Sequence, residues 1–195
     1  MGKGRKWMVL MNKQGGIVFR KGKYKLRKIN RKKSLLSKKR IKLTSWGSLQ
    51  NGGFEDATPL QAAHWSVSSN DIYFAKNDSA LFGKGYAVIA LTKGEDAVLS
   101  QITLPLEDSN YRLAFWLRRV TTPMDGTITV SLIGSSLLPI TYQASLVSYL
   151  KWRKFIITIN SAALDPGKSH TLSVRFSCNS SSLLLNMDNV TLFPT

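Results

Sequence analysis

The positive charge of this 195-residue chain is confined to one end of the sequence. Residues 1–43 hold 12 Lys and 5 Arg with no Asp or Glu, which accounts for the whole net charge of +17. The 11 basic and 11 acidic residues that follow cancel. Like charges within a short segment repel one another and oppose the formation of a compact core. The sequence therefore predicts a basic, extended N-terminal arm over residues 1–43 and one compact domain over residues 44–195.

The arm also carries apolar residues. The runs Trp7–Met11 and Ile17–Phe19 flank the pair Gly15-Gly16, and this pattern predicts a short β-hairpin. Because the arm can bury little apolar surface, we expect it to become ordered only against a partner that neutralises its charge. The residues expected to contact that partner are Trp7, Ile17, Phe19, Arg20, Tyr24, Arg27, Arg31 and Arg40.

No signal peptide or membrane span is recognisable in the sequence. The basic start is followed by an apolar run of only five residues, Trp7–Met11, which is too short for a secretion signal. No run approaches the roughly 18 uninterrupted apolar residues of a membrane span. We therefore expect a protein that is made in a cytoplasm and has no membrane span. The single cysteine, Cys178, is expected to be a small core residue.

After position 43 the sequence changes to short runs of alternating apolar and polar residues, which turn residues separate. This pattern is typical of an antiparallel β-sandwich or barrel, and no long helical periodicity is present. Turns are marked by sequences such as Lys93-Gly94-Glu95-Asp96 and Asp165-Pro166-Gly167. The predicted strands are Tyr86–Leu91, Ala97–Leu104, Tyr111–Val120, Thr127–Ile133, Trp152–Ile159, Thr171–Cys178 and Leu183–Phe193.

Six short motifs follow one another between about residues 49 and 193. They are Asn51-Gly52-Gly53-Phe54-Glu55, Gly85-Tyr86-Ala87-Val88, Leu99-Ser100-Gln101-Ile102, Tyr111-Arg112-Leu113-Ala114-Phe115-Trp116, Trp152-Arg153-Lys154-Phe155 and Met187-Asp188-Asn189-Val190-Thr191-Leu192. In this order they resemble the jelly-roll carbohydrate-binding modules of the galactose-binding-like superfamily. The resemblance implies an all-β fold, a jelly-roll β-sandwich, but a fold alone does not settle a function.

The same resemblance implies a structural calcium ion. In that family, the glutamate after the first phenylalanine and an aspartate near the C-terminus commonly help to bind calcium at one edge of the sandwich. The matching residues here are Glu55 and Asp188, and carboxylate oxygens are ligands that calcium prefers. An alternative remains open, in which both carboxylates cap turns or pair with Lys or Arg.

Sugar binding by these modules usually requires aromatic side chains on the concave sheet or in the loops. Alternation along Tyr111–Arg118 places Trp116 and Arg118 on the face opposite the core. With Tyr73 or Tyr142 nearby, they form the predicted carbohydrate-binding residues. The alternative is that Trp116 is an ordinary core residue, as most tryptophans in a sandwich are.

Catalysis finds no support in the sequence. His64 and His170 are the two histidines, and neither lies in a recognisable nucleophile, base or metal motif. The acidic pairs Glu95-Asp96 and Glu107-Asp108 fall in predicted turns, whereas the acids of a glycosidase must face one another across a cleft. We therefore expect a protein that is not an enzyme.

Taken together, the arm and the resemblance favour a structural protein of a virion, namely that of a tailed bacteriophage. In this hypothesis the protein is a capsid cement or decoration protein, present in many copies, and its arm binds capsid or tail proteins while the jelly roll projects outward. The first alternative is a soluble carbohydrate-binding module, or a tail or baseplate protein that binds surface glycans. The second alternative is a protein that binds nucleic acid through the arm, where basic and aromatic residues are interleaved.

Overall fold

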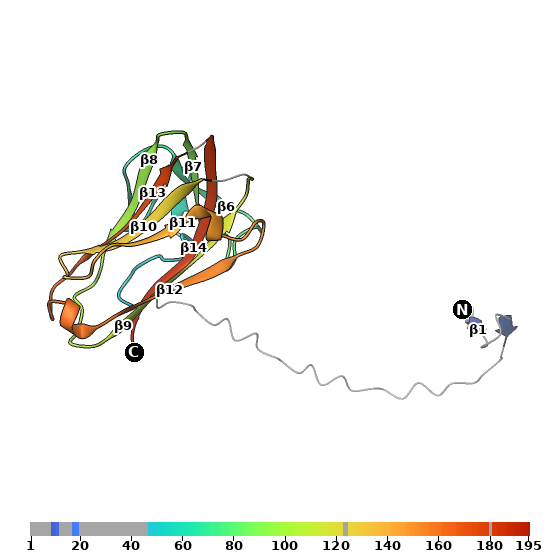
Figure 1. Cartoon of the computed structure of the whole chain (residues 1–195). Helices are drawn as coiled ribbons and strands as arrows, with labels where there is room; N and C mark the ends of the chain where they lie inside the picture. Colours follow the sequence, from blue (N-terminus) through green and yellow to red (C-terminus); the bar gives the residue numbers. More distant parts are fainter. Residues whose placement is uncertain (1–8, 12–16, 20–46, 123–124, 180) are drawn as a thin grey trace, which may run out of the picture. The chain divides into compact units, whose positions relative to one another are not determined.

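The computed structural model describes residues 9–11, 17–19, 47–122, 125–179 and 181–195. The chain divides into two units, Met1–Ile41 and Lys42–Thr195. In the first unit, strands β1 (Val9–Met11) and β2 (Ile17–Phe19) pair antiparallel, which confirms the strands of the predicted hairpin (Figure 1). The backbone of Ile17 and Phe19 lies in β2, whereas the other residues predicted for the arm contact lie outside the described residues. These are Trp7, Arg20, Tyr24, Arg27, Arg31 and Arg40.

The second unit is a sandwich of two five-stranded antiparallel sheets (Figure 1). The β14 sheet has the order β12-β9-β14-β7-β6, with bounds Arg153–Ile159, Tyr111–Arg119, Ser182–Pro194, Gly85–Thr92 and Ile72–Lys76. The β13 sheet has the order β11-β10-β13-β8-β5, with bounds Ile140–Gln143, Gly126–Ile133, Thr171–Cys178, Asp96–Ile102 and Ser66–Val67. A small pair, β3 (Ala57–Thr58) and β4 (Gln61–Ala62), and the 3-10 helices Ala144–Leu146 and Ser161–Ala163 complete the unit.

The core lies between the two sheets and follows the two-residue period of the strands. In β9 the side chains of Tyr111, Leu113, Phe115 and Leu117 are buried, as the alternation predicts. The ring of Phe115 stacks on that of Phe155 in β12 at 5.5 Å between centroids. Cys178 is also buried in the core, as expected.

The all-β jelly-roll prediction is confirmed, and all seven predicted strands are present as β7, β8, β9, β10, β12, β13 and β14. The sequence did not reveal β3, β4, β5, β6 or β11, which have two to five residues each. A run this short cannot show a clear period of two, because one or two alternations also occur in loops. In the described part of the chain, no helix is long and apolar enough to cross a membrane.

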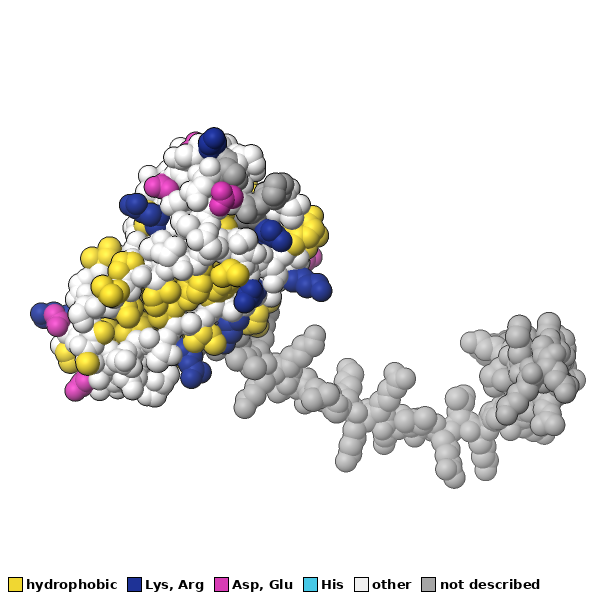
Figure 2. All heavy atoms as spheres, viewed as in Figure 1, with side chains coloured by type: hydrophobic (Ala, Val, Ile, Leu, Met, Phe, Trp, Pro, Cys, Tyr) yellow, Lys and Arg dark blue, Asp and Glu magenta, His cyan; other side chains and the backbone are white. Residues whose placement is uncertain are grey.

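The two sheets leave a seam between their edge strands β11 and β12. Figure 2 shows hydrophobic side chains gathered in a band along this seam. Tyr142 of β11 lies there, with its ring 5.1 Å from Phe155 and 6.4 Å from Phe115. The ring of Tyr142 therefore packs against the side of the core, away from the outer faces of the sheets.

Candidate functional site

One row of side chains crosses the outer face of the β14 sheet. Tyr73 of β6 stands opposite Val88 of β7, Val88 stands opposite Asn186 of β14, and Asn186 stands opposite Arg118 of β9. Neighbouring strands lie about 4.8 Å apart, so the row spans about 14 Å. Alternation puts all of these side chains on the face opposite the core, because their sequence neighbours, such as Leu117 and Leu185, are buried.

A groove with a volume of about 390 Å³ lies over this row. Val88 and Asn186 are almost fully buried and form its floor, whereas Tyr73 is 38% exposed and rises at the β6 edge. Arg118 and Leu150 line the groove near β9. The complete lining is Tyr73, Ala75, Ser79, Tyr86, Val88, Arg118, Val120, Leu150, Leu184 and Asn186. The groove therefore has a mainly apolar lining with a small number of polar groups, which is the usual composition of a small-molecule site.

Arg118 is held from two sides. Its guanidinium carbon lies 4.8 Å from the centre of the Trp152 ring, within the range of a cation–π interaction. In the amide orientation that satisfies both side chains, the Asn186 oxygen accepts a hydrogen bond from Nη2 of Arg118 at 2.6 Å. The Nε of Arg118 is buried with no partner among the described residues. These contacts fix the plane of the guanidinium at the side of the groove.

The structure brings three of the four predicted carbohydrate-binding residues to one face. Trp116 lies in β9 two residues before Arg118, is partly exposed, and has Nζ of Lys154 5.9 Å from its ring centre. Tyr73 and Arg118 line the groove itself. Tyr142 does not lie near the other three, because it belongs to β11 of the other sheet and packs on Phe155; its part in sugar binding stays a prediction.

The loop 77–84 borders the groove and is held in place by Glu55 and Asp188. Oδ2 of Asp188 accepts hydrogen bonds from the backbone N–H groups of Leu81 at 2.8 Å and Phe82 at 3.1 Å. Oε1 of Glu55 accepts from the backbone N–H groups of Lys84 at 2.8 Å and Gly85 at 2.9 Å. Because Ser79 of the same loop lines the groove, the two carboxylates position one of its borders.

Gly83 allows the loop to approach Glu55. Its φ is +65°, and a Cβ at this position would lie 2.0 Å from Oε1 of Glu55. Any larger residue would displace the carboxylate and strain the backbone. The loop and Glu55 therefore fit together only with a glycine at position 83.

Burial raises the pKa of Asp188 to about 7, and the charge of nearby Glu55 adds to the rise, while the three backbone N–H donors partly oppose it. Asp188 has no exposed surface. The raised pKa means that the ionised carboxylate lacks a sufficient positive partner in the described structure.

Oxygen atoms of Glu55, Asp188 and Asn189 are the candidate ligands for the predicted calcium ion. Glu55 and Asp188 supply two carboxylates, and the side-chain oxygen of Asn189 is buried without a partner. All three are hard oxygen ligands of the kind that calcium binds. Among the described residues no group of three His, Cys, Asp or Glu side chains could hold a metal ion, so backbone carbonyls or water would have to complete the coordination.

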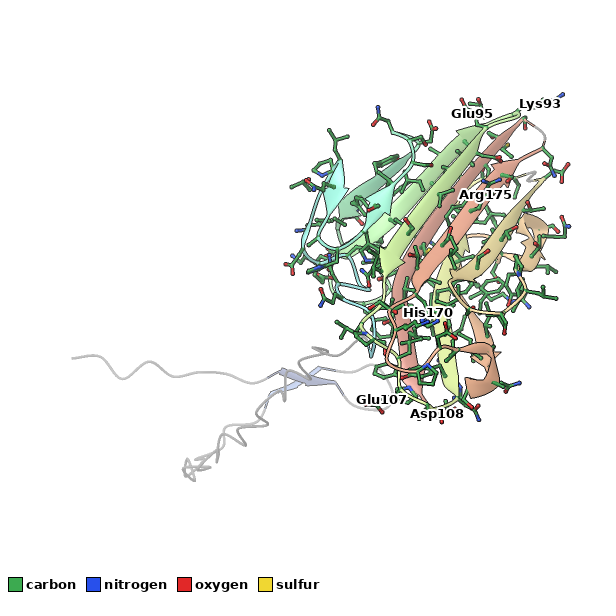
Figure 3. The ribbon with its side chains drawn as sticks, turned by 90° about the vertical axis from the view of Figure 1, so that its left-hand side faces the viewer. Lys93, Glu95, Glu107, Asp108, His170 and Arg175 are labelled. Carbon is green, nitrogen blue, oxygen red and sulfur yellow. The ribbon has the colours of Figure 1, made fainter. Side chains whose placement is uncertain are left out.

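The other titratable groups that the sequence analysis considered are dispersed. Glu95 lies with Lys93 at one end of the sandwich, whereas Glu107 and Asp108 lie at the other end (Figure 3). These carboxylates therefore do not face one another across a cleft. His64 is exposed, whereas His170 is 2% exposed and neither of its ring nitrogens has a partner among the described residues.

No family model matches the sequence, and no curated protein matches it either. Solved structures do match the sandwich. A family 61 carbohydrate-binding module in complex with β-1,4-galactotriose has a TM-score of 0.61 and 18% identity, and the match covers 76% of this chain and 99% of that one. A family 16 carbohydrate-binding module has a TM-score of 0.53 and 14% identity, with 75% and 99% covered. The domain has the jelly-roll fold of carbohydrate-binding modules.

A third match comes from a bacteriophage. The enzymatically active domain of tailspike protein 4 of bacteriophage CBA120 has a TM-score of 0.57 and 10% identity, and the match covers 76% of this chain and 21% of that one. At these identities the likenesses show the fold of the jelly roll and leave its ligand to be argued from the residues on its surface.

Asn186 lies in the groove and Trp152 holds Arg118, and neither residue was predicted from the sequence. Asn186 lies in β14 between the core residues Leu185 and Met187, so strict alternation along this strand would have placed it on the outer face with Leu184. Trp152 precedes β12, and its contact with Arg118 depends on how β12 pairs with β9. No local pattern in the sequence reveals that pairing.

Proposed function

We propose that this protein binds a glycan in the groove on the outer face of the β14 sheet. The observation that carries the proposal is the row from Tyr73 to Arg118, in which an exposed aromatic ring and the polar pair Asn186 and Arg118 lie on either side of Val88. An aromatic face suits the C–H face of a pyranose, while Asn186 and Arg118 can hydrogen-bond to hydroxyl groups. The likeness to modules that bind sugars supports this proposal.

Tyr73→Ala tests the proposal on a glycan array followed by titration calorimetry. The substitution removes the exposed ring, so we expect the affinity for the bound glycan to fall about ten-fold or more. Thr129→Ala is the matched control, because Thr129 is a polar residue in β10 of the other sheet. Equal affinity of Tyr73→Ala and the parent protein would place the glycan elsewhere.

The proposed role is binding without turnover. The described carboxylates and histidines do not converge in the groove, and Arg118 is the one charged residue among the described residues that line it. Oligosaccharides incubated with the protein should be recovered unchanged in chromatography. The appearance of shorter products, lost in the Tyr73→Ala variant, would contradict this role.

We also propose a calcium ion held by Glu55, Asp188 and the side-chain oxygen of Asn189. Bound there, the ion would supply positive charge to a buried carboxylate and stabilise the folded state by mass action. Chelation should then lower the melting temperature, and adding calcium back should restore it. An unchanged melting temperature in chelator would remove the metal from the proposal.

A second candidate function is that of a virion structural protein of the capsid cement or decoration type, or of the tail. Two observations favour it: the +17 charge of residues 1–43 suits an acidic protein lattice, and a bacteriophage tailspike domain shares the fold. In this role many copies of the arm would bind capsid or tail proteins, and the jelly roll would display the groove. Mass spectrometry of purified particles should detect the protein; its restriction to uninfected cells would rule the role out.

A further inference from the structure

We infer that the groove selects glycans that carry a carboxylate, such as uronic acids, and that Arg118 is the residue that meets this group. The inference rests on the proposed glycan binding and specifies the class of sugar.

The charge of the groove favours an anion. Of the described residues that line it, Arg118 is the one with a charge, and the others are apolar, aromatic, hydroxyl or amide residues. The described salt bridges are Lys168–Asp165 and Arg175–Asp96, so no described carboxylate pairs with Arg118. A partly buried cation without a counter-ion attracts an anionic ligand.

The nearest acidic group in the strand register cannot serve as that counter-ion. Asp188 stands opposite Trp116, the neighbour of Arg118 on this face. Its side chain is fully buried and accepts hydrogen bonds from the backbone of Leu81, Phe82 and Asn189. Lys154, which lies beside Trp116, adds a second cation to the same face.

The fixed geometry of Arg118 suits a carboxylate. Stacking on Trp152 and the hydrogen bond to Asn186 hold the guanidinium plane in one orientation. None of the described residues accepts a hydrogen bond from Nη1, so this nitrogen remains for a ligand oxygen. A preoriented guanidinium loses little freedom when it binds a carboxylate, and such charge-assisted bonds are stronger than bonds to a hydroxyl.

The test uses short oligouronides, each paired with its carboxyl-reduced form, which keeps the linkages and removes the charge. Oligogalacturonate, oligoglucuronate and oligomannuronate are titrated into the full-length chain. We expect at least one acidic form to bind about ten-fold or more tightly than its reduced form. Arg118→Gln should abolish this preference, because it lowers the affinity for the acidic form by a larger factor than the affinity for the reduced form.

The basic arm could also attract acidic sugars, so the variants must separate the two sources of charge. Arg175→Gln removes one positive charge from β13 of the other sheet, keeps the arm, and should retain the preference. Arg118→Lys keeps the positive charge but lacks the planar guanidinium, so this variant should retain part of the preference for the acidic form. Circular dichroism confirms that each variant is folded.

The outcomes separate this inference from the proposed function. A preference that survives in Arg118→Gln would come from the arm or from Lys154, and it would overturn the inference. Binding to acidic and reduced forms with equal affinity, or binding only to neutral oligosaccharides, would overturn the inference and leave glycan binding in place. Absence of binding to every acidic, reduced and neutral oligosaccharide would reject the proposed function as well.

Discussion

The two outer faces of the sandwich are built by the same alternation, yet they differ in the size of their side chains. On the β13 sheet, Ser131, Ser173, Ser100 and Ser66 stand side by side across four strands. Figure 3 shows this face, with Arg175 near its middle. On the β14 sheet the corresponding row runs from an exposed tyrosine, over a low floor of Val88 and Asn186, to an arginine.

This difference explains why a groove forms on the β14 face. Serine side chains have one height, so a row of them makes a level surface, whereas large residues beside small ones make walls beside a floor. Alternation decides which residues point outward, but the variation in size along a row decides whether a ligand can be enclosed.

The largest expected effect concerns Asp188, which has no counterpart on the β13 face. In metal-free buffer its folded-state pKa of about 7 lies above the ordinary value of 3.8. The folded state therefore keeps the proton after the unfolded chain has lost it, and stability falls as pH rises from about 4 to about 7, by on the order of 4 kcal/mol.

Asp188→Asn should remove most of this pH dependence, because an amide does not titrate. Asp96→Asn is the matched control, since Asp96 is an exposed aspartate in the other sheet; this variant should behave as the parent protein does. Urea denaturation between pH 4 and pH 8 in chelator measures both. A pH dependence unchanged by Asp188→Asn would show that other groups cause it.

Smaller effects on stability are expected from substitutions of two buried polar residues, Gln101 and His170. Gln101 exchanges hydrogen bonds with the backbone N–H and C=O of Gln50 at 2.8 and 2.7 Å. Gln101→Leu leaves both groups unpaired and should lower the free energy of unfolding by about 2 to 3 kcal/mol.

His170→Leu provides the comparison, because neither ring nitrogen of His170 has a partner among the described residues. Replacing it removes two buried polar atoms without leaving a partner unpaired, so stability should stay the same or rise by about 1 kcal/mol. Thermal and urea unfolding of Gln101→Leu and His170→Leu measure both changes in stability. A large loss in His170→Leu would indicate that its nitrogens are bonded.

The smallest effect is expected on the outer face of the β13 sheet, which carries the row of serines. Arg175 and Asp96 lie 3.8 Å apart with more than half of each side chain exposed, and exposed pairs contribute little. Arg175→Gln should change the free energy of unfolding by less than about 0.5 kcal/mol. A larger loss in urea unfolding would mean that this face depends on its charges after all.

The sequence allowed the sandwich to be predicted because its long strands carry a clear period of two. The burial of Tyr111, Leu113, Phe115 and Leu117 follows directly from that period. The short edge strands β5, β6 and β11 could not be predicted, since their formation depends on neighbours that are distant in sequence.

The candidate site could be predicted only in part for a similar reason. Alternation gave the face of Trp116 and Arg118, and Tyr73 was expected nearby. Asn186 enters the groove, and Trp152 holds Arg118, through strand order and register that the sequence does not reveal. Tyr142 is the clearest example. Nothing in the sequence around it indicates that β11 belongs to the β13 sheet and not to the β14 sheet.

The position of β14 has a consequence for how the protein is made. This last strand in chain order, Ser182–Pro194, lies between β9 and β7 at the centre of its sheet. During synthesis, the edges of β9 and β7 that pair with β14 stay unpaired until these residues leave the ribosome. Unpaired strand edges of this kind can pair with other chains. A chain that lacks Ser182–Pro194 would therefore be an aggregation-prone product rather than a slightly shortened binding protein.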